Sequence, residues 1–137
     1  PMTLACIDVS GIQLVNERLG YPAGDQMMCT IAHAIRQNVV RPDLVGRLAG
    51  TTFAVLLPKT ASNDANVVLD QLHNALKDER RKYSHPLNFY ISAVACPKAP
   101  RTVAELMQRA DSQMARMKNA KKDFIQVVTS EGSAMLN

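Results

Sequence analysis

The chain has 137 residues, of which 47% are hydrophobic and 20% are charged. This length allows one domain with a core and is too short for two. No apolar run approaches the roughly 18 residues of a membrane span, and the basic-then-apolar pattern of a signal peptide does not occur in this sequence. We therefore expect a cytoplasmic domain with no membrane insertion in this segment, which would also suit the cytoplasmic part of a membrane-tethered protein.

The three cysteines do not form the pattern of a disulfide framework or a zinc site, because their number is odd and their spacing is wide. The cysteines are Cys6, Cys29 and Cys96, and we expect Cys6 and Cys96 to be buried because they lie in apolar runs. The three histidines are expected at the surface or at helix flanks rather than as ligands: His33, His73 and His85.

The net charge of +4 comes largely from two basic stretches, residues 78–85 and 116–123. We interpret both as solvated helix ends, and the alternative is a phosphate-binding surface. No motif of a nucleic-acid reader is present, so we expect no nucleic-acid partner.

The first 41 residues are predicted to form one strand followed by two helices. An apolar run ending in an acid predicts a buried strand over 3–9. Ser10 and Gln13 have the spacing of a capping box for a short helix that Gly20 and Pro22 stop. A second helix is predicted to begin near Gly24 and to end before Pro42.

The rest of the chain begins with a predicted hairpin. Strands over 44–48 and 52–57 flank a turn at Ala49 and Gly50. A helix follows over 61–80, then a strand over 87–96, a helix opened by a Thr102–Glu105 capping box, and a last strand over 123–128. Residues 129–137 are expected to form a flexible tail.

This order of elements predicts an α/β fold, an α+β sandwich with a mixed five-stranded sheet. Helices should cover both faces, with one β-hairpin in the middle of the chain. The hairpin must be antiparallel, whereas crossovers through helices favour parallel pairs. We place the domain at residues 1–128.

Three motifs in this order resemble the GGDEF domain, the diguanylate cyclase fold. The stretch "CIDVSGIQLVNERLGYPAGD" is similar to the family's opening D-x-D-x-F-K-x-x-N-D and G-H-x-x-G-D pattern. "RLAGTTFAVLLP" aligns with its R-x-G-G-D/E-E-F hairpin, and "ADSQMARMKNAKKD" resembles its closing helix. The similarity covers residues 4–128. The helix that usually precedes the first strand of the family is missing, which suggests a fragment of a longer protein.

The resemblance implies a chemistry: the family joins two GTP molecules into cyclic di-GMP across a two-fold dimer. By similarity, Asp8 stands at a metal-ligand position, and Asn16 and Asp25 stand where the family reads guanine. Lys118 and Lys122 match the pair that holds the terminal phosphates. Magnesium ions need carboxylate oxygens to neutralise the triphosphate, and the family supplies them from the first strand and the hairpin.

The departures from the family pattern are concentrated at the hairpin tip. Ala49 replaces the first glycine of the motif, while Gly50 and Phe53 are kept. Thr51 replaces the metal carboxylate and Thr52 the second acid. We therefore expect no catalytic residues, no required cofactor, at most weak GTP binding and a doubtful Mg²⁺ site. The inhibitory product site is also broken: Asp43 is present, but Val40 occupies the arginine position.

Each surviving residue also has a structural interpretation. Asp8 could cap the next turn, Asn16 could be a turn residue, and Asp25 suits a helix N-terminus. Lys118 and Lys122 suit the last turn of a helix, where the helix dipole favours cations.

Four functions remain open at this stage. The favoured one is a catalytically inactive regulatory domain that contacts a partner protein or a neighbouring phosphodiesterase or sensor domain, with a homodimer also allowed. The alternative is a GTP sensor that regulates such a neighbour. An active cyclase, or an α/β domain with only the fold in common, would be the remaining cases.

Overall fold

The computed structural model describes residues 1–41, 44–84, 86–98, 102–120 and 125–129. The elements in chain order are β1 (Met2–Ser10), α1 (Ile12–Leu19), α2 (Tyr21–Gln37), β2 (Val45–Ala49), β3 (Thr52–Pro58), α3 (Ser62–Arg80), β4 (Asn88–Cys96), α4 (Val103–Asn119) and β5 (Ile125–Thr129). Every predicted helix and strand is present, with boundaries that differ by a few residues.

The five strands form one mixed sheet in the order β2-β3-β1-β4-β5. β1 is antiparallel to both β3 and β4, whereas β4 and β5 pair in parallel. The strands joined by helices do run parallel to each other, as predicted. β1 lies between β3 and β4, however, so only β4 and β5 are parallel neighbours.

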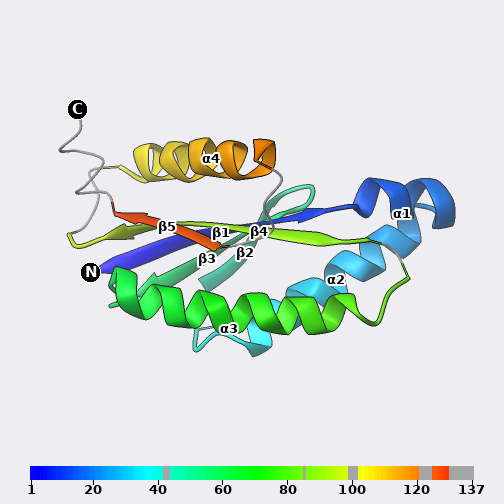
Figure 1. Ribbon diagram of the computed structural model, residues 1–137, viewed down its shortest axis with the longest axis horizontal. Helices are drawn as coiled ribbons and strands as arrows, with labels where there is room; N and C mark the ends of the chain where they lie inside the picture. The colour runs from blue at the N-terminus through cyan, green and yellow to red at the C-terminus, as the bar shows by residue number, and fades with distance from the viewer. Residues whose placement is uncertain (42–43, 85, 99–101, 121–124, 130–137) are drawn as a thin grey trace.

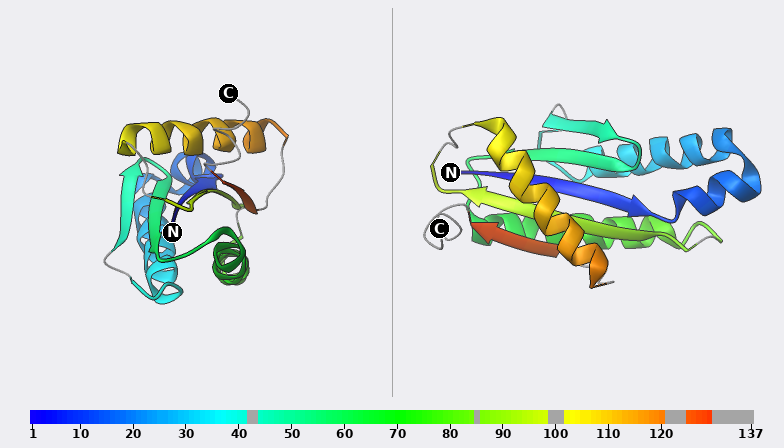
Figure 2. Two further views of the ribbon diagram at one scale, coloured as in Figure 1. Left: turned by 90° about the vertical axis from the view of Figure 1, so that its left-hand side faces the viewer. Right: turned by 90° about the horizontal axis from the view of Figure 1, so that it is seen from above.

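Helices cover both faces of the sheet (Figure 1). α2 and α3 lie on one face, and α4 crosses the other face diagonally (Figure 2). β1 is therefore buried on both sides, which explains its nearly continuous apolar sequence. α1 lies beyond the end of β1 and packs on α2 (Figure 1).

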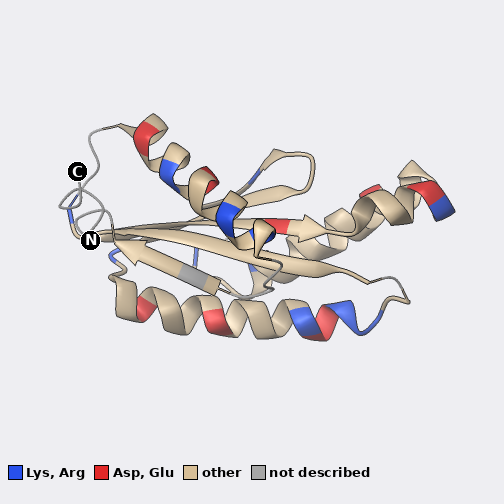
Figure 3. Ribbon diagram, turned by 45° about the horizontal axis from the view of Figure 1, so that its top comes forward, with Lys and Arg blue, Asp and Glu red and all other residues tan. Residues whose placement is uncertain are grey.

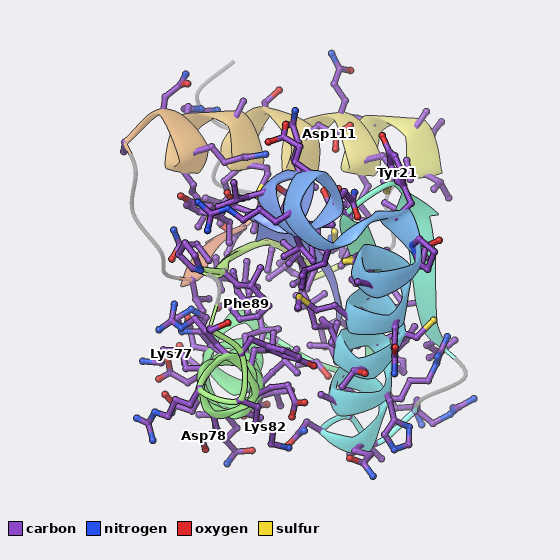
Figure 4. All side chains as sticks on the ribbon, turned by 90° about the vertical axis from the view of Figure 1, so that its right-hand side faces the viewer. Tyr21, Lys77, Asp78, Lys82, Phe89 and Asp111 are labelled. Carbon is purple, nitrogen blue, oxygen red and sulfur yellow. The ribbon has the colours of Figure 1, made fainter. Side chains whose placement is uncertain are left out.

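The core consists of two apolar clusters, one on each face of the sheet, because successive side chains of a strand point to opposite faces. Ile7, Phe53 and Phe89 belong to the larger cluster, under α2 and α3, and Figure 4 shows Phe89 pointing into the interior. Leu4 and Cys6 of β1 belong to the smaller cluster, under α4. Neighbouring residues of β1 thus point to opposite faces, and this alternation decides that Asp8 shares the α4 side with Cys6.

The prediction of a capping box at Ser10 is wrong. Ser10 is the last residue of β1, and α1 is capped by Gly11 at φ 106° with no side-chain hydrogen bond. A Cβ atom on Gly11 would lie 2.3 Å from the carbonyl oxygen of Pro86. The sharp turn between strand and helix therefore requires glycine, and Gln13 instead donates to Glu17 along the helix.

The second helix begins earlier than predicted. α2 begins at Tyr21 and contains Pro22 in its first turn, where the missing N–H of proline costs no helical hydrogen bond. At the other end of the chain Thr129, assigned to the tail, is the last residue of β5. The rest of that tail lies outside the described residues.

Two further expectations concern polar and reactive side chains. Cys6 and Cys96 are buried, which confirms the prediction for these two cysteines, and Cys29 is exposed. His73 was expected near the surface but is 7% exposed on the inner face of α3. The helical spacing of its apolar neighbours extends to position 73 and would have indicated burial.

The basic stretch at the end of α3 forms local ion pairs. Arg81 contacts Asp78 and Lys82 contacts Glu79, and Lys77, Asp78 and Lys82 point outward in Figure 4. This supports the interpretation as a solvated helix end. None of the helices in the described residues combines the length and the apolarity that a membrane crossing requires.

Candidate functional site

Asp8 lies near the end of β1, on the face that α4 covers. Its backbone is in register with Thr52 of β3 and Tyr90 of β4, the two neighbouring strands. The residue is 5% exposed. A buried carboxylate needs compensating partners, because the loss of hydration strongly disfavours the charged form.

Three side chains compensate Asp8. The hydroxyl groups of Thr51 and Thr52 each donate to its Oδ1 at 3.0 Å. The Lys118 Nζ lies 2.5 Å from its Oδ2. Lys118 is in the last turn of α4, which lies over the sheet and carries basic residues (Figure 3). Asp8 therefore joins β1, the hairpin and α4, and its carboxylate contacts these elements rather than capping the next turn, the alternative that the sequence had left open.

The hairpin geometry presents both threonines to Asp8. Gly50 has φ 48°, a left-handed conformation at the tight turn, and the Arg47 guanidinium folds over the turn and donates to the Gly50 carbonyl oxygen. The backbone N–H of Val9 donates to the carbonyl oxygen of Thr51 at 3.0 Å. The tip is thus fastened to β1 on one side, and Ala49 is exposed at the end of β2.

The side chains around Asp8 do not fit a magnesium site. Mg²⁺ requires an octahedron of oxygen ligands, usually with one or two carboxylates. Here one carboxylate accepts two hydroxyl hydrogen bonds and an ammonium ion pair. In the described part of the chain, no three side chains of His, Cys, Asp or Glu come together as a metal-binding group.

The predicted guanine-reading residues lie in a second place, on the pair formed by α1 and α2. Asn16 is half-buried on α1, and its Oδ1 is buried with no hydrogen-bond partner within the described residues. A Cβ atom on Gly24 would lie 1.8 Å from this oxygen, so α2 approaches Asn16 closely only because position 24 is glycine. Asp25 follows Gly24 and is exposed.

The structure therefore brings the predicted site residues together in two groups. Asp8, Thr51, Thr52 and Lys118 form the first, which we call the Asp8 cluster, and Asn16 with Asp25 forms the second. Lys122 and Asp43 lie outside the described residues. Val40, at the position of the lost product-site arginine, is 94% exposed on the chain after α2.

The sequence interpretation missed the direct contact between Asp8 and Lys118. Both residues were identified, but as ligands for a metal and for phosphate. The signal was available: once the hairpin acids are replaced by threonine, a carboxylate in an apolar strand still needs a cation, and the closing helix offers one.

Cys6 lies on the same face of β1 as Asp8. Burial raises the pKa of its thiol from 9.0 to about 11, with a smaller contribution from the negative charge of Asp111. The thiol is therefore neutral and unreactive at physiological pH, which excludes Cys6 as a nucleophile beside the Asp8 cluster.

Comparison with known proteins supports the assignment that the motifs suggested. The family model described as "Diguanylate cyclase, GGDEF domain" matches residues 1–123. The diguanylate cyclase DgcP of Pseudomonas aeruginosa is 27% identical over 128 residues, which are 92% of this chain. The chain spans only 19% of that relative's length.

Solved structures agree on the fold. The GGDEF domain of TpbB (also called YfiN) from Pseudomonas aeruginosa superposes with a TM-score of 0.75 at 30% identity, over 93% of this chain and 81% of that one. The diguanylate cyclase SiaD from the same species, solved in complex with its activator SiaC, gives a TM-score of 0.76 at 25% identity, over 93% of this chain and 50% of that one. The chain belongs to the GGDEF domain family.

Proposed function

We propose that this GGDEF domain is a catalytically inactive regulatory domain of a cyclic di-GMP signalling protein. The observation that carries the proposal is the Asp8 cluster. The carboxylate at the metal-ligand position is bound to Thr51, Thr52 and Lys118 of the same chain. The proposed domain acts through contacts with other domains of a longer chain or with a protein partner.

The chemistry of GTP condensation explains why this arrangement is inactive. Charge on the triphosphate must be neutralised while a 3′-hydroxyl attacks the α-phosphate, and hard cations held by carboxylates do this. Threonine hydroxyls carry no charge to hold such cations. Loss of an acid-base group alone lowers rates by about 10²–10⁴.

A product assay tests the proposal. The chain is incubated at high concentration with GTP and Mg²⁺, and cyclic di-GMP is quantified against the same chain without GTP. We expect no product above that background. Turnover near the rate of an active cyclase would refute both the regulatory proposal and the sensor alternative.

Partner contacts suit a domain of this size within a larger protein. SiaD is a relative whose structure was solved with an activator protein bound, so a GGDEF protein is known in complex with a regulator. The chain also spans a minor part of DgcP, which leaves room for other domains. Both facts support a regulatory role without identifying the partner.

A second candidate, a GTP sensor, is favoured by the Asn16 group. The Oδ1 atom of Asn16 is buried without a partner, which costs stability unless a ligand supplies a donor. Guanine offers N–H donors at its N1 and exocyclic amine. We propose weak binding, with a Kd of roughly 0.1–1 mM, that depends little on Mg²⁺.

A GTP titration followed by NMR tests the sensor. Resonances near Asn16 and Asp25 should shift at millimolar GTP, and Asp25→Ala should weaken binding by about 1.5–3 kcal/mol if its carboxylate accepts from guanine. Guanosine serves as the control without phosphates. If no resonance near these residues moves, the sensor function is ruled out and partner contacts remain.

A further inference from the structure

The positive charge beside Asp8 comes from Lys118, a residue of the chain itself, and not from a metal ion. Lys118 reaches from the last turn of α4 to the Oδ2 of Asp8, while the two threonines occupy Oδ1. We propose that Lys118 is an internal replacement for a divalent cation: its ammonium group occupies the cation position beside Asp8 and holds α4 to β1 and the hairpin without metal. This inference shares residues with the proposed function and rests on the loss of catalysis at the hairpin.

The burial of the two partners is unequal, and this makes Lys118 essential to Asp8. The side chain of Asp8 is 7% exposed, whereas that of Lys118 is 46% exposed. If Lys118 is removed, a charged carboxylate remains buried with only two neutral donors. If Asp8 is removed, the ammonium group remains hydrated. Loss of the lysine should therefore harm the fold more than loss of the aspartate.

A metal ion and the Lys118 ammonium cannot both bind Asp8 closely. Magnesium would approach a carboxylate oxygen to about 2.0–2.1 Å, and the ammonium nitrogen already lies 2.5 Å from Oδ2. One carboxylate would then face three positive charges, with no second carboxylate from the hairpin. A divalent cation can enter only when Lys118 leaves.

The Lys118–Asp8 ion pair also fixes the C-terminal end of α4, which without it would be held by side-chain packing alone. The buried face of α4 consists of Leu106, Ala110, Gln113, Met114 and Met117. Lys118 directly follows the last of these residues. The ion pair thus anchors the C-terminal turn of α4 to the strand that bears the family's metal-ligand position, and so couples α4 to the hairpin tip.

Thermal unfolding of four variants tests the proposal. Lys118→Met, Asp8→Asn and the double variant are compared with Arg81→Met, a control that breaks the exposed Arg81–Asp78 pair at the C-terminal end of α3. Each is measured in chelator and in millimolar Mg²⁺. We expect the wild type to have the same Tm in both, Lys118→Met to lose about 5–10 °C in chelator, and Arg81→Met to lose less than about 2 °C.

Two further results complete the test. The double variant should regain much of the stability lost by Lys118→Met, because the buried charge is gone, and it provides a readout if the single variant does not fold. Mn²⁺ should broaden NMR signals near Thr51 and Thr52 in Lys118→Met and leave them sharp in the wild type.

The proposal would be overturned by Mg²⁺ stabilisation of the wild type that disappears in Asp8→Asn. It would also be overturned if Lys118→Met behaved like Arg81→Met, or if it gained no Mn²⁺ broadening. The samples in these unfolding and Mn²⁺ experiments contain no nucleotide. Product formation in the GTP assay would therefore refute the proposed loss of catalysis separately from the replacement of the metal.

Discussion

The Asp8 cluster and the Asn16 group each contain a buried side-chain oxygen, and they differ in how these oxygens are satisfied. Asp8 has partners for both carboxylate oxygens, supplied by the hairpin and α4. Asn16 has a buried Oδ1 with no hydrogen-bond partner in the described chain. In the Asp8 cluster, side chains of the same chain occupy both carboxylate oxygens. In the Asn16 group, one buried acceptor has no partner among the described residues.

This difference distinguishes polar groups that the fold itself satisfies from one that it does not. A polar group with internal partners contributes to the fold, and a ligand must break those contacts to use it. A buried acceptor without a partner lowers stability, and such a cost is commonly found at functional positions. The carboxylate oxygens of Asp8 are therefore satisfied within the chain, whereas the Asn16 Oδ1 is left as the buried acceptor on which the proposed sensor depends.

The largest effect is expected from Phe53, the phenylalanine of the hairpin motif that this chain retains. Its ring is 2% exposed in the cluster under α2 and α3, so Phe53→Ala should lower the free energy of unfolding by about 3–5 kcal/mol. Urea unfolding measures this loss. A change below about 1 kcal/mol would mean that the hairpin does not contribute to the core. Leu48→Ala on the exposed edge strand is the control.

A pH-dependent effect is expected from Cys6, on the same strand as Asp8. The folded thiol has a pKa raised to about 11, so above pH 9 the unfolded chain loses its proton first and stability falls. The fall between pH 9 and 11 should be about 2–3 kcal/mol and absent below pH 9. Because other groups titrate there, the measurement is the difference between the wild type and Cys6→Ala. Parallel curves for the two proteins would contradict the prediction.

A smaller effect tests the close approach at the Asn16 group. The Cβ of Gly24→Ala would collide with the Asn16 Oδ1, and overpacking of this kind should cost about 1–2 kcal/mol after the gain in helix propensity. Thermal unfolding measures the loss. Adding Asn16→Ala should restore most of the stability. If Gly24→Ala stabilises the chain, Asn16 moves freely and its position imposes no constraint.

The smallest change in stability is expected from Asn16→Ala itself. Removing a buried acceptor without a partner relieves its desolvation, so the free energy of unfolding should stay within about 1 kcal/mol. GTP-dependent NMR shifts should nevertheless disappear, which marks the residue as binding rather than structural. A loss of stability as large as that of Phe53→Ala would place Asn16 with the Asp8 cluster instead.

The sequence alone determined most of the fold. The periodicity of apolar residues predicted the order of strands and helices along the chain and the helices on both faces of the sheet. Burial of one face of a helix, or of both faces of a strand, produces a recognisable spacing of apolar residues. The prediction failed where the chain turns: Gly11, not Ser10, caps α1, because the close approach of Pro86, just before the neighbouring strand β4, requires glycine. Local propensity does not contain that contact.

At the site, the sequence determined the candidates and the tertiary structure decided their partners. The motifs identified Asp8, Thr51, Thr52 and Lys118 as positions that matter, and showed that the acids of the hairpin are gone. That these four residues meet follows from the strand order and from the path of α4 across the sheet. An ion pair between residues 110 positions apart depends on distance and burial, and neither quantity is encoded in the local pattern around either residue.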